Sequence, residues 1–291
     1  MEPLNIKLVN VNQYYGKKHV LKDVNLTIEK GMFGLLGRNG AGKTTLMKTL
    51  VTLLQKKSGD ATICGVDLAE ASEIRTLVGY LPQDFTMYPD MTVKQALDYL
   101  GVLSGLSKDV IQKKGAYLLE IVNLMEHQHK KVKALSGGMK RRLGIAQALL
   151  HDPKVVIVDE PTAGLDPEER IRFRNLLSEI AKERIVLLST HIVGDIEATC
   201  ERIGILHEGR IVYNGTVSHL LQDAQHKVYQ ALIPSKQFEA LKKQYAVTSM
   251  LIQGADVLVR FISEHKPTFS AELVAPNMED AYMYYIAKEH M

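Results

Sequence analysis

Cysteine and tryptophan are scarce in this sequence, whose 291 residues include two cysteines and no tryptophan. Cys64 and Cys200 form no Cys-x-x-Cys pair, which excludes a disulfide framework and is typical of a protein kept in a reducing compartment. We expect both cysteines to be buried and to have no chemical role. No apolar run approaches the roughly 18 residues that a membrane-spanning helix requires. Residues 1–7 also lack the charged and then apolar pattern of a targeting signal.

The sequence also lacks a large excess of positive or negative charge. Lys and Arg number 36 against 33 Asp and Glu, and the net charge of +3 is too balanced to indicate a nucleic acid as the main partner. Apolar residues make up 46% of the chain, which is enough for a sizeable core, and the length favours one large domain with a small one. We therefore expect a cytoplasmic protein, and any role at a membrane requires a second polypeptide that spans it.

A glycine-rich segment follows the pattern G-x-x-x-x-G-K-[ST] of a phosphate-binding loop. It consists of Gly37, Arg38, Asn39, Gly40, Ala41, Gly42, Lys43 and Thr44. The run 32–36 before it is typical of a buried strand, and residues 45–54 after it have the apolar spacing of a helix. In such a loop the backbone N–H groups attract phosphate, Lys43 can reach the β- and γ-phosphates, and the Thr44 hydroxyl can bind Mg²⁺. The sequence thus predicts a nucleoside triphosphate site, and we add Thr45 to its ATP-binding residues.

The strands around this loop predict an α/β core. Residues 6–11 and 20–28 alternate apolar and polar side chains, which indicates an antiparallel layer. The runs 155–158 and 185–188 are apolar throughout, which predicts strands buried on both faces of a mainly parallel sheet. Ligands of such sheets bind beyond the carboxyl ends of the strands. The residues that we expect to meet there in one site are Gly37, Gln83, Asp159 and His191.

A helical insert is predicted at about residues 85–150. Its first helix begins at a capping box formed by Thr92 and Gln95, and its third begins near Ser136. The second helix is expected at 109–125. One face of that helix is predicted to carry the apolar residues Val110, Tyr117, Leu118, Ile121, Val122 and Met125.

After residue 221 the pattern changes to that of a small α+β domain at 222–291, for which the sequence suggests no chemistry. Strands are expected at 227–233, 247–252 and 257–262, and helices at 235–244 and 278–290. Tyr282, Tyr284 and Tyr285 are expected to pack the last helix. The predicted fold class is therefore α/β: a P-loop NTPase core at 1–221, with a mainly parallel sheet, an antiparallel layer and a helical insert, followed by this small domain.

Two adjacent acids, Asp159 and Glu160, end the buried strand at 155–158. Because successive strand side chains point to opposite faces, the two carboxylates are suited to different tasks. Asp159 is placed to hold Mg²⁺, and Glu160, one residue further, is suited to act as a general base on water near the γ-phosphate. The alternative is a pair of solvated charges at the end of a strand, which the phosphate-binding loop makes less favoured.

A second glycine pair lies in the sequence Leu-Ser-Gly-Gly-Met-Lys-Arg-Arg at residues 135–142. Ser136, Gly137 and Gly138 at a helix start offer a second phosphate-binding surface. One chain does not need two such surfaces for one nucleotide, but two chains that face each other head to tail do. With the loop and the acids, this segment resembles the ATP-binding cassette (ABC) ATPases over about residues 6–221, and in particular the separate ATPase subunit of ABC-2-type exporters.

The resemblance implies roles for four further segments. Tyr15 would stack on adenine, and Gln83 would sense Mg²⁺ and the attacking water. Residues 163–166 would form the D-loop that crosses to the other subunit, with Asp166 at its end. His191 would contact the γ-phosphate. Each residue also has a plainer interpretation when taken alone: Tyr15 as a turn aromatic, Gln83 as a polar loop residue and His191 as a helix cap.

One position departs from the usual signature, because Met139 replaces glutamine after the two glycines. We interpret it as a marker of the exporter branch, which residues 276–281 near the end of the chain also resemble. The resemblance implies Mg²⁺ and ATP as cofactors, and as partners a second ATPase subunit, identical or different, together with membrane-spanning permease subunits. The resemblance implies that no nucleic acid is a partner, and that the protein lies on the inner face of the cell membrane, bound to the permease. An importer ATPase, or an ABC ATPase acting on ribosomes or DNA, remains the alternative.

Overall fold

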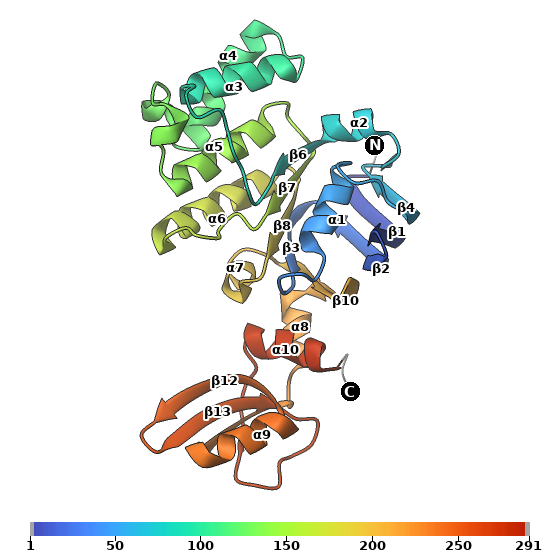
Figure 1. The fold of residues 1–291 in the computed structure, drawn as a ribbon, viewed down its shortest axis with the longest axis vertical. Coiled ribbons are helices and arrows are strands. Elements are labelled where there is room, and N and C mark those ends of the chain that lie inside the picture. Colours follow the sequence, from blue (N-terminus) through green and yellow to red (C-terminus); the bar gives the residue numbers. More distant parts are fainter. Residues whose placement is uncertain (1–2, 289–291) are drawn as a thin grey trace.

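Six strands form a mainly parallel sheet in the upper, larger part of the molecule (Figure 1). The computed structural model describes residues 3–288. Each pair of neighbours in this sheet is parallel except β10 with β9, which form an antiparallel hairpin. In spatial order the strands are β10 (Arg210–Thr216), β9 (Arg202–His207), β3 (Gly31–Leu36), β8 (Ile185–Thr190), β7 (Val155–Asp159) and β6 (Val78–Leu81). The predicted α/β fold class with a mainly parallel core is confirmed.

An antiparallel layer packs beside this sheet, as the alternating N-terminal segments predicted. Its spatial order is β2 (Lys18–Glu29), β1 (Asn5–Tyr15), β4 (Ser58–Ile63) and β5 (Val66–Asp67). The inward residues of β1 and β2, such as Ile6 and Leu26, share one buried cluster with Phe33 of β3 and Leu46 of the helix after the loop. Because one face of the layer is buried, the period-2 alternation of its sequence is well defined.

The helix that follows the phosphate-binding loop is shorter than predicted. It is α1 (Lys43–Leu50), and the expected extension to residue 54 is wrong. Thr52 has a left-handed backbone with φ +58, which ends the helix, and Leu53 is exposed rather than packed. A second helix, α2 (Ala71–Leu77), was not predicted; only one of its residues, Ile74, is buried, so its apolar pattern is weak.

The helical insert contains the three expected helices, α3 (Val93–Leu103), α4 (Lys108–Ile121) and α5 (Gly137–Leu149), with the short 3-10 turns η1 (Met125–His127) and η2 (Val132–Ala134) between the last two. The capping box is confirmed. The Gln95 N–H donates to Thr92 Oγ1 at 3.2 Å, and the Thr92 N–H donates to Gln95 Oε1 at 2.9 Å.

The predicted apolar face of α4 is correct only in part, because Leu118 and Val122 are buried as predicted but other members of that face are exposed. The buried residues of this helix are Ile111, Gly115, Leu118 and Leu119, whereas the predicted Tyr117 is 62% exposed. The helix carries apolar residues on two faces, and the face that carries Ile111 packs against α3. A Cβ on Gly101 of α3 would lie 2.6 Å from Ile111 Cγ1, so this glycine allows the two helices to approach closely.

The remaining helices of the larger part are α6 (Pro167–Ala181), α7 (Val193–Glu197) and α8 (Val217–Asp223). The first two pack on the central sheet, and α8 leads from it to a small third sheet. The small sheet is antiparallel, in the order β12 (Ala246–Gln253), β13 (Asp256–Ile262), β11 (Val228–Pro234) and β14 (Glu272–Leu273). The turn η3 (Ser235–Gln237) and helix α9 (Phe238–Gln244) accompany it.

The last helix is α10 (Met278–Lys288), close to the predicted 278–290; residues 289 and 290 of that prediction lie outside the described residues. Figure 1 shows α10 between the small sheet and the larger part of the molecule. Cys64 and Cys200 are buried, as expected. Within residues 3–288, every helix is too short or too polar to cross a membrane.

Candidate functional site

The carboxyl ends of four parallel strands, β3, β6, β7 and β8, lie at the same edge of the central sheet. The segments that follow them begin at Gly37, Pro82, Glu160 and His191. An open pocket of about 360 Å³ lies at this edge. The residues that line it are Tyr15, Lys18, Val20, Asn39, Gly40, Gly42, Lys43, Thr44, Thr45, Gln83 and Glu160.

The loop between β3 and α1 owes its shape to its glycines. Gly42, which precedes α1, has φ +113, a conformation that residues with a Cβ rarely adopt. A Cβ on Gly37 would lie 2.5 Å from the carbonyl oxygen of Leu206 on β9. The first residue of the loop therefore lies against the sheet, and the loop then curves over the N-terminus of α1. This is the arrangement in which backbone N–H groups surround an anion at a helix N-terminus.

Lys43 is buried in this loop, with 4% of its surface exposed. Its Nζ donates to the carbonyl oxygens of Gly37, at 2.7 Å, and Arg38, at 3.3 Å. The same nitrogen lies 3.0 Å from Oε1 of Glu160. The buried ammonium group therefore faces one carboxylate and two carbonyl groups, which compensate for the water that it has lost.

Glu160 is the partner of both Lys43 and His191. Its Oε2 lies 3.1 Å from Nδ1 of His191, and its side chain is also largely buried. Its backbone is left-handed, with φ +46, and its N–H donates to Oγ of Ser189 at 3.0 Å. A non-glycine residue held in this conformation is costly and is frequent at functional sites. The strain directs the carboxylate between the lysine and the histidine.

Asp159, one residue earlier, is fully buried. Its Oδ1 accepts a hydrogen bond of 2.5 Å from the Ser189 hydroxyl, whereas its Oδ2 has no hydrogen-bond partner among the described residues. Burial raises the pKa of the nearby Tyr80 phenol, and the negative charge of Asp159 acts in the same direction. A buried carboxylate oxygen without a donor fits a hard cation such as Mg²⁺, and Thr44 and Gln83, which line the pocket with the neighbouring Glu160, offer further oxygen atoms.

Sequence reasoning missed Lys18, Val20 and Ser189. Lys18 pairs with Tyr15 across the hairpin of β1 and β2. The register of these two strands shifts along their length, so this pairing could not be deduced from the sequence. Ser189 binds Asp159 through its hydroxyl and Glu160 through the backbone N–H. Its position directly after the apolar run 185–188 was an available signal, because a polar residue at a buried strand end requires a partner.

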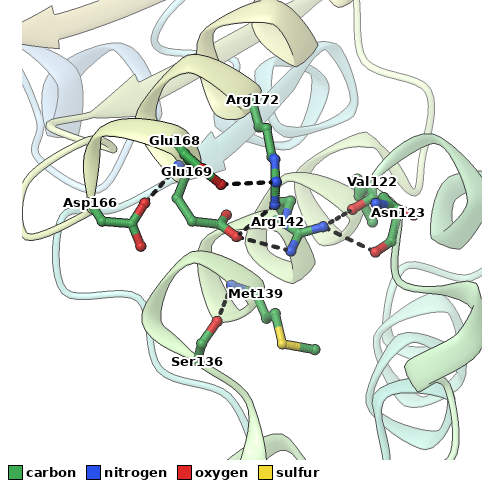
Figure 2. Close-up of polar contacts among 9 residues, drawn as sticks. All are labelled: Val122, Asn123, Ser136, Met139, Arg142, Asp166, Glu168, Glu169 and Arg172. Carbon is green, nitrogen blue, oxygen red and sulfur yellow. Dashed lines mark hydrogen bonds and ion pairs between the residues drawn. The ribbon is translucent and has the colours of Figure 1, made fainter.

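Ser136 lies at the start of α5 in Figure 2, and its Oγ accepts a hydrogen bond of 3.2 Å from the Met139 N–H. Gly138 lies close to α6, because a Cβ there would be 2.4 Å from Oε2 of Glu169. The pocket at the loop is lined by none of the four signature residues in the part of the chain that the structure describes. These residues are Ser136, Gly137, Gly138 and Met139.

Asp166 forms the N-cap of α6, where its Oδ1 accepts from the Glu169 N–H at 2.9 Å. Figure 2 shows Arg142 of α5 reaching Glu169. The distance from Arg142 Nη2 to Glu169 Oε1 is 3.5 Å, and Nη1 donates to the carbonyl oxygens of Val122 and Asn123, each at 3.0 Å. The start of the signature helix, the end of α4 and the start of α6 are thus joined through one buried guanidinium group.

The structure therefore brings most of the predicted site residues together at one edge. Tyr15, Gln83 and the loop residues from Asn39 to Thr45, except Ala41, line the pocket. Gly37 and Arg38 bind Lys43, His191 lies against Glu160, and Asp159 is linked to Glu160 through Ser189. Ala41 adjoins the loop start, 3.3 Å from a Cβ built on Gly37.

Comparison with known proteins places these features in one family. The sequence model of the family "ABC transporter" matches residues 21–163. The chain is 41% identical over 223 residues to the ABC transporter ATP-binding protein YxlF of Bacillus subtilis (strain 168), with coverage of 76% of this chain and 74% of that one. It is 39% identical over 223 residues to the Nod factor export ATP-binding protein I of Cupriavidus pinatubonensis (strain JMP 134 / LMG 1197), with coverage of 76% and 68%.

Solved structures agree in fold. The structure of an ATP-binding subunit of an ABC transporter superimposes with a TM-score of 0.68 at 30% sequence identity, and the match covers 75% of this chain and 92% of that one. The sequence match to YxlF and this structural match thus cover similar shares of the chain, 76% and 75%.

Proposed function

Because the chain belongs to the ABC transporter family of ATP-binding, ATP-hydrolysing proteins, we propose that it is the ATPase subunit of an ABC-2-type exporter. The observation that carries this proposal is the buried group of Lys43, Glu160 and His191 at the mouth of the glycine-rich loop. An exporter role is supported by the name of the Nod factor export relative. The alternative, an ATPase that acts on ribosomes or DNA, has no support among the named relatives.

Nucleotide binding is assigned to residues from two layers of the fold. The N–H groups of the loop from Gly37 to Thr45 would surround the phosphates, and Lys43 would exchange Glu160 for a phosphate oxygen. Tyr15, at the end of β1, is 49% exposed and lines the same pocket, which suits a ring that stacks on a base.

Residues with suitable oxygen atoms for Mg²⁺ are Thr44, Gln83 and Asp159. Asp159 Oδ2 has no hydrogen-bond partner in the described part of the chain, and the other two side chains line the pocket. Bound there, the ion would neutralise phosphate charge. The protein holds Asp159 in place through the Ser189 hydroxyl, so that its second oxygen remains available.

Proton removal from water is assigned to Glu160. Its carboxylate would accept the proton as the water oxygen attacks the γ-phosphate. His191 touches the same carboxylate and would orient it and contact the γ-phosphate. The strained backbone of Glu160 supports this assignment, because such strain is retained where geometry matters more than stability.

A head-to-tail dimer is proposed because Ser136, Gly137, Gly138 and Met139 lie outside the pocket that holds the loop. A second subunit would bring its Ser136 hydroxyl and glycine N–H groups to the γ-phosphate and exclude water from it. Asp166 caps α6 and is joined to the signature helix through Glu169 and Arg142, so the D-loop and the signature would reach the partner together.

Export requires membrane-spanning partners, because transport across a bilayer needs a polypeptide that crosses it. We assign to the permease an apolar hollow beside Gln83, lined by Phe85, Met87, Tyr88 and Leu100 among others. Movement of Gln83 on ATP binding would shift its neighbours Pro82 and Asp84, which line this hollow. The chain would then lie at the inner face of the cell membrane, held there by the permease.

Purification from native membranes tests this proposal. Mild extraction of the tagged chain should recover a membrane-spanning subunit in stoichiometric amount, identified by mass spectrometry, together with ATPase activity that Glu160→Gln abolishes. Recovery of ribosomal proteins or DNA-binding proteins in place of a permease would contradict the exporter assignment.

A further inference from the structure

The segment that follows His191 contains one buried carboxylate, that of Asp195. This segment leads from β8 into the short helix α7, which packs against β3 and β8 of the central sheet (Figure 1). Asp195 lies in the first turn of α7, and 1% of its surface is exposed. A carboxylate buried to this extent requires partners for its oxygen atoms. The partners of Asp195 therefore show to what the histidine segment is attached.

Both partners come from the stretch of chain that begins at Glu160. Oδ2 of Asp195 accepts a hydrogen bond of 2.5 Å from the hydroxyl of Thr162, which is 2% exposed. Oδ1 lies 3.5 Å from Nη1 of Arg174 on α6, and the same nitrogen donates to the carbonyl oxygen of Gly194 at 3.4 Å. Asp195 thus joins the histidine segment to the segment that carries Glu160, once close to Glu160 and once on α6.

The His191 ring needs such an attachment, because 40% of its side chain is exposed and burial alone does not fix it. Its Nδ1 lies 3.1 Å from Oε2 of Glu160. On the side of β8 its backbone is held by Thr190, whose carbonyl oxygen accepts from the Gly37 N–H at 3.3 Å. On the side of α7 it is held by Asp195. The contact between the histidine and the glutamate therefore depends on how these two segments are joined.

The alternative is that Asp195 only holds α7 on the sheet, but α7 has other contacts for this purpose. A Cβ on Gly34 of β3 would lie 2.2 Å from Cδ1 of Ile196, so an apolar side chain already packs α7 closely against the sheet. The Thr199 hydroxyl donates to the backbone carbonyl oxygen of Asp195 at 2.6 Å within the same segment. A buried charge is a costly addition to these contacts, which favours a role in geometry over a role in stability alone.

We propose that Asp195 is a positioning residue for His191, and that it sets the histidine against Glu160 through the hydroxyl of Thr162. The effect on ATP hydrolysis rests on the proposed function. Thr162 directly precedes residues 163–166, the segment that we assign as the D-loop, so the same hydrogen bond also fixes this segment relative to the histidine.

Removal of the Thr162 hydroxyl tests this role against two matched variants. Thr162→Val has nearly the same shape but cannot donate to Asp195, whereas Thr162→Ser keeps the donor. Thr199→Val loses a hydroxyl that also bonds Asp195, but from within the histidine segment. The parent and the three variants are compared without nucleotide by the NMR signal of His191 Nδ1, which is assigned by its loss in His191→Gln. We expect this signal to shift toward that of a free imidazole in Thr162→Val alone.

ATPase kinetics then measure the consequence for the site. In Thr162→Val, kcat should fall by about tenfold, as is typical when a group that orients an active-site residue is lost, and KM for ATP should stay within about twofold. KM should be kept because Thr162 is not among the residues that line the nucleotide pocket in the described part of the chain. Thr162→Ser and Thr199→Val should keep the kcat of the parent.

Three outcomes would overturn the positioning role. The first is an unchanged His191 signal in Thr162→Val. The second is an equal shift in Thr199→Val, which would indicate only general packing of α7, and the third is a Thr162→Ser variant that behaves like Thr162→Val. If Thr162→Val does not fold, Arg174→Gln decides instead. It removes the other partner of Asp195 from a side chain that is 19% exposed, and it should shift the same signal; an unchanged signal would overturn the role.

Failure of the proposed function is distinguished from failure of this inference. A folded parent protein without ATPase activity would overturn the proposed function. The His191 signal needs no nucleotide and would still decide whether Asp195 and Thr162 set the position of the histidine.

Discussion

The Nζ atom of Lys43 lies 3.0 Å from Oε1 of Glu160, and both side chains are buried. The residue that we assign to bind phosphate and the residue that we assign to activate water are therefore ion-paired with each other. Phosphate must compete with the Glu160 carboxylate for Lys43, and the same competition releases the carboxylate for its role as a base. The pair couples nucleotide binding to readiness for hydrolysis.

Glu160→Gln should lower ATP hydrolysis by on the order of a hundredfold or more, because an amide cannot accept the proton of water. ATP binding should be kept, since the neutral amide of this variant no longer competes with phosphate as an anion. ATP-bound dimers should accumulate and be visible by light scattering or native mass spectrometry. Near-normal turnover in this variant would remove Glu160 from the catalytic role.

Tyr15→Ala should weaken ATP affinity by about 1–2 kcal/mol if the ring stacks on the base. The neighbouring Tyr14 is a matched control, because its ring stacks on His19 with centroids 4.1 Å apart and it does not line the pocket. Isothermal titration of both alanine variants measures the difference. GTP should compete measurably, because stacking tolerates any flat base. Equal affinities in the two variants would make Tyr15 a turn residue only.

Arg142→Met should destabilise the fold by about 3 kcal/mol, because it leaves Glu169 and two carbonyl groups without their shared partner. Arg172→Met is the control. Arg172 also contacts Glu169, at 3.6 Å, but its side chain is 58% exposed, so the loss should be below about 0.5 kcal/mol. Urea unfolding gives both values, and similar losses would show that the buried guanidinium group is not the main link between α5 and α6.

Local patterns in the sequence were sufficient for much of this structure. The capping box of Thr92 and Gln95 and the start of a helix near Ser136 depend on residues within four positions of each other, and both were predicted correctly. Gln83 and Glu160 line the same pocket. This proximity could be expected because the carboxyl ends of parallel strands lie at the same edge of a sheet.

Contacts between distant segments could not be predicted in the same way. The buried face of α4 was decided by Ile111 against Gly101 of another helix, and the apolar pattern of α4 allowed a second choice. Ser189 was missed because its importance lies in bonds to a different strand.

In the proposed dimer two chains share each ATP, and complementation between defective chains tests this arrangement most directly. Ser136→Arg alone should bind ATP nearly as well as the parent but neither dimerise nor hydrolyse it, and Lys43→Ala alone should be inactive because its loop is impaired. In a mixed dimer of the two, one site holds both defects and the other holds neither. We predict that ATPase activity returns in part on mixing. Full activity in Ser136→Arg alone would contradict the shared site.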